Sequence, residues 1–377
     1  MLIEIHAIQN HSPANLNRDD INAPKTCYFG GVLRSRISSQ CIKRSIRMSD
    51  QFRQLLGGVR TRQLARLIAE NLPPNSDSRT RAATILKGCG IGAKKEDRSD
   101  MLVYTTRSAI REMSDLLQNT NGRTDEELSR DFGRIIAERT AVPDMALTGR
   151  MLETGVLDNT TVEAALQVAH AFSTHEARPE VDYYVAADDI PGDDAGAGYV
   201  DEAGFASACF YKYFSVHWEK LVENLRGNSE LAAHTLGAFI HAAALANPTG
   251  KQNSFAAHNP PDGMLVEFRA TPLSYANAFA QPVTAQGERH LISQSIAELA
   301  KYARDLDIGF GRPQVRFWFS PNHRYPFVVA EGKESSTLAE HNPLSLQDLI
   351  AAVVLAKPIG LHWGKVQKVI LTDEVPA

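Results

Sequence analysis

Residues 32–48 carry the side chains best suited to chemistry, because this segment combines several cations with no acidic residue. If residues 39–48 form a helix, a step of about 100° per residue gives it two faces. One face carries Gln40, Lys43, Arg44 and Arg47. The other face carries Cys41, Ile42 and Ile46, which can pack against a sheet. The cationic face can bind a polyanion, and an ordinary solvated helix face is the alternative.

The segment before this helix adds more positive charge. Its polar loop and short strand supply Arg18, Lys25, Arg34 and Arg36. Ser38 or Ser39 is expected to cap the helix, because a hydroxyl there accepts a free amide proton of the first turn. The positive end of the helix dipole also favours an anionic ligand.

Charge is segregated along the chain. The sequence has 40 Lys and Arg against 44 Asp and Glu, a net charge of −4. Residues 1–66 contain 11 Lys and Arg and 4 Asp and Glu, a net charge of +7. The other 311 residues therefore contain 29 Lys and Arg and 40 Asp and Glu, a net charge of −11. Such segregation concentrates positive potential on one surface, as nucleic-acid binding requires. Contact between the basic part of one copy and the acidic part of the next is a compatible interpretation.

Asp19 and Asp20 support a different hypothesis. Two carboxylates on a loop beside a nucleic-acid groove can hold Mg²⁺ for phosphodiester cleavage. Neighbouring carboxylates point apart in most backbones, so a role in stabilising a turn is favoured. A metal-dependent endoribonuclease that uses Asp19 and Asp20 is therefore the alternative to a protein that is not an enzyme.

Other catalytic arrangements find no support. His170 and His175 are five residues apart, which takes them off one helical face, so structural roles are expected for both. Gly250-Lys251-Gln252 lacks the earlier glycine and the following Ser or Thr of the phosphate-binding loop of nucleoside triphosphatases. Lys251 and Gln252 are instead expected to face a nucleotide backbone. No cofactor and no metal site is predicted.

Secondary-structure elements must position these side chains. The first is a strand predicted at residues 1–10, where apolar and polar residues alternate. Residues 59–180 show helical periodicity broken by short Pro and Gly segments, which predicts a helical insertion. Within it, Thr124 and Thr160 each begin a capping-box pattern, so helices are expected near residues 125 and 161.

The second half returns to strand patterns after a Gly- and Asp-rich projecting loop at residues 188–204. Strands are expected at residues 181–185, 206–218, 264–269, 314–319 and 367–371. Helices are expected at residues 229–246, 291–305 and 345–356. With the insertions removed, the order is β-α-β-β-α-β, which is typical of an α+β fold with a ferredoxin-like or RNA-recognition-like sheet.

Several ordered motifs resemble the backbone subunit of the type I-E CRISPR Cascade complex, the CasC family. The opening matches at His11-Ser12-Pro13, Leu16-Asn17-Arg18-Asp19-Asp20, Phe29-Gly30-Gly31, Arg36-Ile37-Ser38-Ser39-Gln40 and Lys43-Arg44. Later matches are Ala146–Met151, Ala169-His170-Ala171, Thr174-His175, Gly250-Lys251-Gln252 and Asn259-Pro260. The resemblance covers most of the chain and is weakest at residues 60–140 and after about residue 310.

The resemblance implies roles for particular residues. It implies that guide RNA is lined by Lys25, Ser38, Gln40, Lys43 and Arg47, with Arg18 nearby. It also implies that Met151 wedges beside a displaced base, with core packing as the alternative, and that Tyr183 and Tyr184 lie at the base of a thumb. The related type III subunits place a cleaving aspartate on a loop comparable to that of Asp19.

The implied protein is a hand-shaped scaffold without catalytic activity. Its expected parts are a palm at residues 1–58 and 208–377, a helical finger insertion at 59–180 and a thumb at 181–207. Its expected partners are CRISPR guide RNA, the target DNA strand paired to the guide, neighbouring copies of itself and other Cascade subunits. A general single-strand binder that works alone is a third possibility.

Composition agrees with a cytoplasmic protein that has no membrane partner. No stretch approaches 18 apolar residues, and the N-terminal residues lack the pattern of a secretory signal. The four cysteines, Cys27, Cys41, Cys89 and Cys209, form no Cys-x-x-Cys pair, so neither zinc binding nor redox chemistry is indicated.

Overall fold

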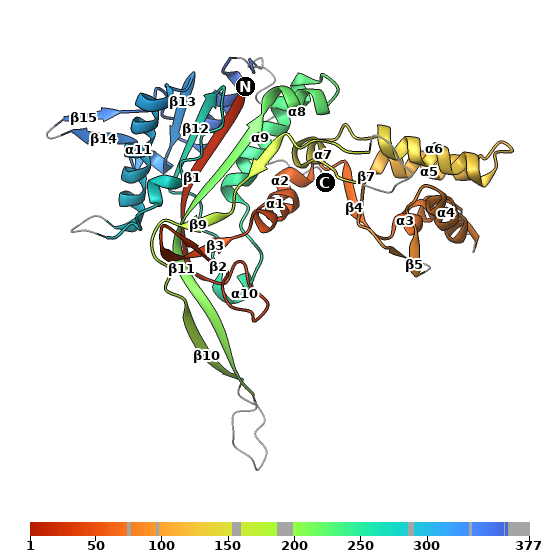
Figure 1. Ribbon diagram of the computed structural model, residues 1–377, viewed down its shortest axis with the longest axis horizontal. Coiled ribbons are helices and arrows are strands. Elements are labelled where there is room, and N and C mark those ends of the chain that lie inside the picture. The colour runs from red at the N-terminus through yellow and green to blue at the C-terminus, as the bar shows by residue number, and fades with distance from the viewer. Residues whose placement is uncertain are drawn as a thin grey trace, which may run out of the picture. The chain divides into compact units, whose positions relative to one another are not determined.

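The computed structural model of the protein describes residues 1–73, 77–95, 98–152, 160–186, 199–285, 290–331, 334–357 and 359–360 (Figure 1). Helices and antiparallel strands are mixed, as the sequence predicts for the α+β class. The described residues form two compact units. The first contains Met1–Phe52, Val168–Ser215 and the chain from Leu236 onwards, and the second contains Arg53–Gln167 and Val216–Thr235.

An antiparallel sheet is the centre of the first unit. Along its main path the strands are β13 (Val315–Phe319), β12 (Gly263–Arg269), β1 (Leu2–Ala14), β11 (Tyr199–His217), β9 (Ala171–Ser173), β3 (Val32–Ile37) and β2 (Thr26–Phe29). Two further strands, β8 (Leu166–Val168) and β10 (Glu180–Ala186), also pair with β11. The strands expected at residues 1–10, 181–185, 206–218, 264–269 and 314–319 are thus confirmed. The ferredoxin-like order stays a prediction.

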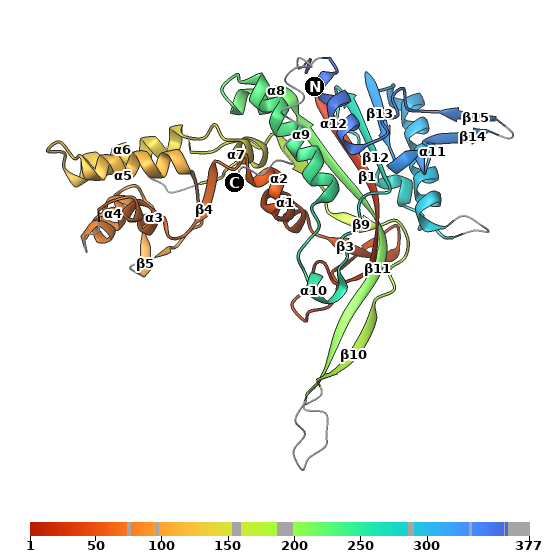
Figure 2. The same ribbon diagram turned by 180° about the vertical axis from the view of Figure 1, so that it is seen from behind.

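The adjacent strands β1 and β12 are covered on both faces. Ile3, Ile5 and Ile8 of β1 are fully buried, and so is nearly all of β12. The strands pair in antiparallel register, with Ile5 opposite Val266. Helix α11 (Leu291–Phe310) packs its apolar side into the same core, where its residues join those of the sheet (Figures 1 and 2).

A buried network of charges lies among these strands and α11. Glu267 of β12 accepts hydrogen bonds from Arg269 Nε at 2.8 Å and from Arg316 Nε at 2.5 Å. Both guanidinium groups also contact Asp307 of α11, at 3.1 and 2.8 Å. The Tyr275 hydroxyl donates to Glu267 at 2.6 Å. Two carboxylates therefore balance two guanidinium groups inside the protein, which is the condition under which buried charge is tolerated.

The remaining elements of the first unit surround the sheet. They are α1 (Ser39–Met48), α10 (Gln252–Phe255), α12 (Leu346–Leu355), β14 (Val328–Glu331), β15 (Glu334–Thr337) and the short 3₁₀ helices η1 (Ala276–Phe279) and η2 (Pro321–His323). Helix α9 (Ser229–Leu245) begins in the second unit and ends in the first. The expected helices at residues 229–246, 291–305 and 345–356 are confirmed. The expected strand at residues 367–371 lies outside the described residues.

The second unit is a helical cluster with small strand pairs. Its elements are α3 (Leu64–Glu70), α4 (Asp77–Gly88), α5 (Arg107–Gln118), α6 (Asp125–Glu138), α7 (Pro143–Thr148), α8 (Trp218–Asn224), β4 (Gly58–Thr61), β5 (Ala93–Lys95), β6 (Arg98–Ser99) and β7 (Val103–Thr106), with α2 (Asp50–Arg53) at the boundary. The Thr124 capping box is confirmed: its hydroxyl accepts the Glu127 amide proton and the Glu127 side chain accepts that of Thr124.

The helix expected near residue 161 is wrong. Val162 instead forms an antiparallel bridge with Arg150, with both backbone hydrogen bonds at 2.8 Å. The Thr160 hydroxyl donates to the Leu152 carbonyl rather than capping a helix. The capping-box pattern is present in the sequence, but the Thr160 hydroxyl and the Val162 backbone form their hydrogen bonds with a segment about ten residues earlier instead of with a helix.

Strands β10 and β11 extend from the sheet as a two-stranded ribbon (Figures 1 and 2). Their register places Val181 opposite Gly204 and Tyr184 opposite Asp201. The Gly- and Asp-rich loop predicted at residues 188–204 falls largely on residues 187–198, which lie outside the described residues. Among the helices that are described, none has the length and apolar character needed to cross a bilayer.

Candidate nucleic-acid interface

Helix α1 forms where the sequence predicts it. The Ser38 hydroxyl accepts the Cys41 amide proton at 3.3 Å, so Ser38 is the N-cap. Ile42 and Ile46 are buried and fix the helix against the core. These contacts determine which face of α1 is free for a ligand.

The polar face of α1 is accessible. Gln40 and Arg44 are exposed, and Lys43 and Arg47 are half-buried. Lys43 and Arg44 form no ion pair with a carboxylate in the part of the chain that the structure describes. Ion pairing with the described residues therefore does not account for these two charges.

A hydrogen-bonded loop places Arg18 and Lys25 beside the start of α1. Asn17 Oδ1 accepts the Ser38 amide proton at 2.8 Å, and the Asn17 carbonyl accepts that of Lys25 at 2.9 Å. The Lys25 carbonyl in turn accepts the Arg36 amide proton at 2.8 Å. Lys25 is half-buried and Arg18 is exposed, with Arg18 Nη1 3.3 Å from Asn22 Oδ1. Backbone and Asn17 side-chain hydrogen bonds thus join the loop, β3 and α1 in the structure without a ligand.

Asp19 stabilises the turn of this loop. Its Oδ1 accepts amide protons from Ile21 at 3.0 Å and Ala23 at 2.9 Å, as the turn hypothesis predicts. Asn22 takes a positive φ of 63°, which asparagine tolerates better than most residues. In the described segments, no group of three or more His, Cys, Asp or Glu residues is arranged to hold a metal ion.

A cleft of about 840 Å³ opens between this loop, α1 and the end of α9. Its lining includes Arg18, Asp19, Arg44, Met48, Asp50, Leu245 and Gly250. Two of the predicted RNA-binding cations, Arg18 and Arg44, therefore face one hollow. The two arginines can bind a phosphate and the apolar groups Met48 and Leu245 can contact a flat ring, whereas Asp19 and Asp50 oppose an anion.

The loop that carries Lys251 and Gln252 packs against the same region. A side chain at Gly250 would lie 2.6 Å from the Leu16 carbonyl oxygen, so only glycine fits this close approach. Lys251 has a positive φ of 49°. Gln252 Nε2 donates to the carbonyls of Pro248 at 2.9 Å and Ala257 at 3.3 Å, so its amide group holds the loop together.

Met151, expected to wedge beside a displaced base, and the two tyrosines expected at the root of the thumb are exposed. The Tyr183 side chain is 71% accessible and lies on β10. The Tyr184 hydroxyl, on the opposite side of the strand, donates to Asp201 at 2.9 Å. Met151, in the second unit, is 80% exposed, so core packing does not explain this methionine.

The base of the β10–β11 ribbon is hydrogen-bonded to the basic loop, residues 15–25 between β1 and β2. Asn15 Nδ2 donates to the carbonyls of Asn22 and Gly204, both at 2.8 Å. Because Val181 pairs with Gly204, Tyr183 lies two residues further out along the ribbon. The first unit therefore brings the cations of the loop and α1 together with the root of the strand that carries the two tyrosines.

His170 and Arg36 are part of this surface, although neither was among the predicted RNA contacts. His170 Nδ1 accepts the Ser39 amide proton at 3.0 Å and lies 3.5 Å from Arg36 Nη1. Burial lowers the pKa of the His170 imidazole, and the charge of Arg36 lowers it further. Lys25 and Lys43 act in the same direction. The expected structural role is confirmed for His175, whose Nε2 accepts the Cys209 amide proton at 3.1 Å.

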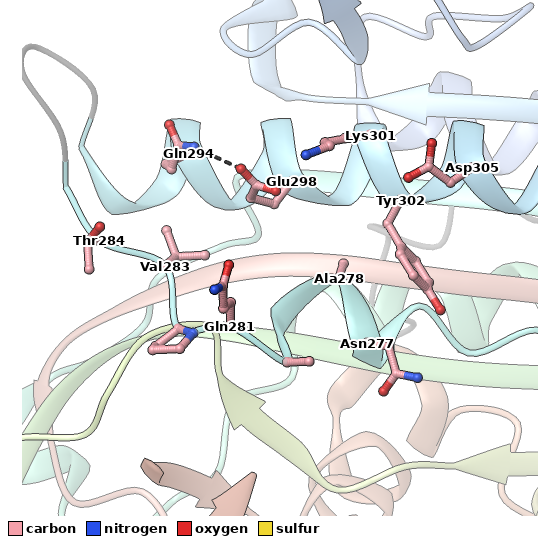
Figure 3. A pocket seen from close by; sticks show the side chains of 12 residues that line it. Asn277, Ala278, Gln281, Val283, Thr284, Gln294, Glu298, Lys301, Tyr302 and Asp305 are labelled. Carbon is pink, nitrogen blue, oxygen red and sulfur yellow. Dashed lines mark hydrogen bonds between the residues drawn. The ribbon is translucent and has the colours of Figure 1, made fainter. Parts of the chain in front are cut away.

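A second pocket, of about 740 Å³, lies between α11 and residues 277–284 (Figure 3). Glu298, Lys301, Tyr302 and Asp305 of α11 line one side of it. Gln294 Nε2 donates to Glu298 at 3.1 Å across one turn of the helix. None of the predicted site residues lines this pocket.

Comparisons with known proteins give a consistent result. The family described as CT1975-like protein matches residues 3–352. A solved chain titled "CRISPR RNA-guided surveillance complex, pre-nicking" is 28% identical with a TM-score of 0.79, covering 94% of this chain and 99% of that one. Another, titled "CRISPR RNA-guided surveillance complex", is 25% identical with a TM-score of 0.59, covering 94% and 100%. No curated protein sequence matches the chain.

Proposed function

Because the chain belongs to the CT1975-like protein family, we propose that it is a subunit of a CRISPR RNA-guided surveillance complex and acts there as the RNA-binding backbone. Both similar solved chains carry that complex in their titles, and each is covered over nearly its whole length. Full coverage supports a shared role for the chain as a whole rather than for one module.

The preformed row of cations at the start of α1 carries the proposal. Lys25 and Lys43 act electrostatically on His170 beside the N-terminus of α1, and Arg44 follows in the middle of the helix. Hydrogen bonds to loop and strand fix the position of this helix. Groups of this kind bind phosphates and carry no information about bases. The subunit holds guide RNA by its backbone and leaves the base edges free, so pairing with a target DNA strand reads the sequence.

The finer assignment is to type I-E Cascade, in the cytoplasm. Several copies lie side by side along one guide RNA, with other Cascade subunits as further partners. The motifs around Arg18 and Gln40 support this type, since they match that family in order and spacing. The basic balance of residues 1–66 and the acidic balance of the rest also favour contact between copies.

Binding by one copy is expected to be weak and to depend on salt. Each phosphate contact contributes roughly −0.7 to the slope of the logarithm of the binding constant against the logarithm of the salt concentration. About four to six contacts per copy therefore give a slope near −3 to −4. Copies that lie next to each other on one strand gain from high effective concentration. Affinity therefore resides in the assembly more than in the monomer.

Assembly in steps is the first expected result. When the purified chain is mixed with single-stranded RNAs of increasing length, the mass of the complex, measured by light scattering after gel filtration, should rise by whole subunits. A binder that acts alone should instead give one protein per RNA at limiting protein, with no neighbour preference. Random spacing along long RNAs would contradict the backbone role.

The endoribonuclease alternative gives a second test. Assembled protein is incubated with matched RNA and Mg²⁺, beside Asp19→Asn and Asp20→Asn variants. We expect intact RNA in all three, because the Asp19 carboxylate accepts two backbone amide protons within its own loop. Regularly spaced cuts that either variant abolishes would establish the nuclease and reject the non-catalytic assignment.

A further inference from the structure

The His170 side chain lies at the centre of the cationic surface. It comes from the segment before β9, and its ring reaches the N-terminus of α1. Lys25 of the loop, Arg36 of β3 and Lys43 of α1 are the charged groups that act on it electrostatically. All three are cations, and the residue is exposed to solvent. An exposed histidine on which three cations act is placed to meet an anion.

The hydrogen bonds of the ring determine its tautomer. The Ser39 amide can only donate, and so can the Arg36 guanidinium, and both are directed at Nδ1. Nδ1 must therefore carry the lone pair, which leaves the proton of a neutral imidazole on Nε2. A second proton could go only on Nδ1, where it would oppose both donors and three nearby cations.

We propose that His170 is a further RNA-contacting residue, which donates its Nε2 proton to a phosphate oxygen of the bound strand while the ring stays neutral. This inference rests on the proposed function and adds a contact of a different kind. Lys43 contributes a charge, whereas His170 contributes a directed hydrogen bond that is fixed by the cap of α1. A neutral donor displaces no counterion from RNA, so it adds affinity without adding salt dependence.

Two replacements separate this contact from the helix cap. His170→Ala removes both hydrogen bonds. His170→Asn keeps a short acceptor near the position of Nδ1 and so retains the bond from the Ser39 amide, but it does not reach the position of Nε2. The probe is a fluorescent single-stranded RNA of mixed sequence, and anisotropy with the full chain gives the affinity at several salt concentrations.

Both variants are expected to bind about tenfold more weakly than the parent protein, as for loss of a hydrogen bond to a charged acceptor. Their salt slopes should equal that of the parent, whereas Lys43→Ala should show a smaller slope. Thermal unfolding should place His170→Asn close to the parent protein. The affinity ratio of parent to His170→Asn should stay constant between about pH 6.5 and 8, because the ring binds in its neutral form.

Different failures have different meanings. If Lys43→Ala weakens binding while His170→Asn binds like the parent, His170 only caps α1 and the inference is wrong. If the advantage of the parent over His170→Asn grows steeply as pH falls, the ring binds as a cation and the neutral-donor proposal is wrong. If none of the variants, Lys43→Ala included, changes binding, the proposed function itself fails.

Discussion

Lys43→Ala combined with Arg47→Ala is expected to weaken RNA binding about 10- to 100-fold per copy, equally for RNAs of any sequence. Both side chains project from the polar face of α1, whose buried Ile42 and Ile46 hold it in place. Removing two phosphate contacts should also reduce the salt slope by about 1.4. Filter binding or anisotropy over a range of salt concentrations measures both quantities.

A matched control changes the same amount of charge elsewhere. Arg66 and Arg134 are exposed and form surface ion pairs with Glu70 and Asp131 in the second unit. Their double replacement by alanine should leave affinity and slope within about twofold of the parent. A loss that differs strongly between RNA sequences would mean that α1 reads bases, which would reject the backbone-contact hypothesis.

Glu267→Ala is expected to destabilise the first unit by about 3–5 kcal/mol, because among the described residues it leaves Asp307 alone to pair with two buried guanidinium groups. Burial alone would raise the pKa of Glu267, but Arg316 and the other nearby charges hold it below its ordinary value. A lowered pKa means that this stabilisation is present above about pH 4.5 and is lost as the pH falls further. Chemical denaturation measures the change.

Two further variants keep the prediction testable if Glu267→Ala does not fold. Glu267→Gln keeps the volume and part of the hydrogen bonding, so it should be intermediate. Glu70→Gln breaks an exposed pair with Arg66 and should change stability by no more than about 0.5 kcal/mol. Equal stability of Glu267→Gln and the parent would show that the charge of this carboxylate contributes nothing.

Local patterns were sufficient for much of the framework. Ser38 caps α1 because hydroxyl and amide lie within three residues of each other, and the Thr124 capping box is equally local. The alternation of residues 1–10 predicts a strand, which β1 is, but it does not predict that the polar residues Glu4, His6 and Gln9 are buried as well. For the two caps, both partners of the interaction lie within a few positions of each other in the sequence. For the strand, the alternation itself is the local signal.

What the sequence did not predict depends on partners far along the chain. His170 meets Ser39 across 131 positions, so the spacing to His175 carried no information about its role. The charges around Glu267 meet through strand pairing and α11, which periodicity alone does not reveal. The positive φ of Lys251 is likewise imposed by packing rather than by residue type.

The basic loop is encoded early in the gene, but the residues that hold it are translated late. The Asn15 side chain donates a hydrogen bond to the carbonyl of Gly204, 189 positions downstream. Strand β1 pairs with β12, at Gly263–Arg269. The cations of the loop are thus synthesised before the residues that hold the loop in place. In the proposed function, an ordered RNA-binding surface therefore requires that synthesis has passed β12, which ends at Arg269.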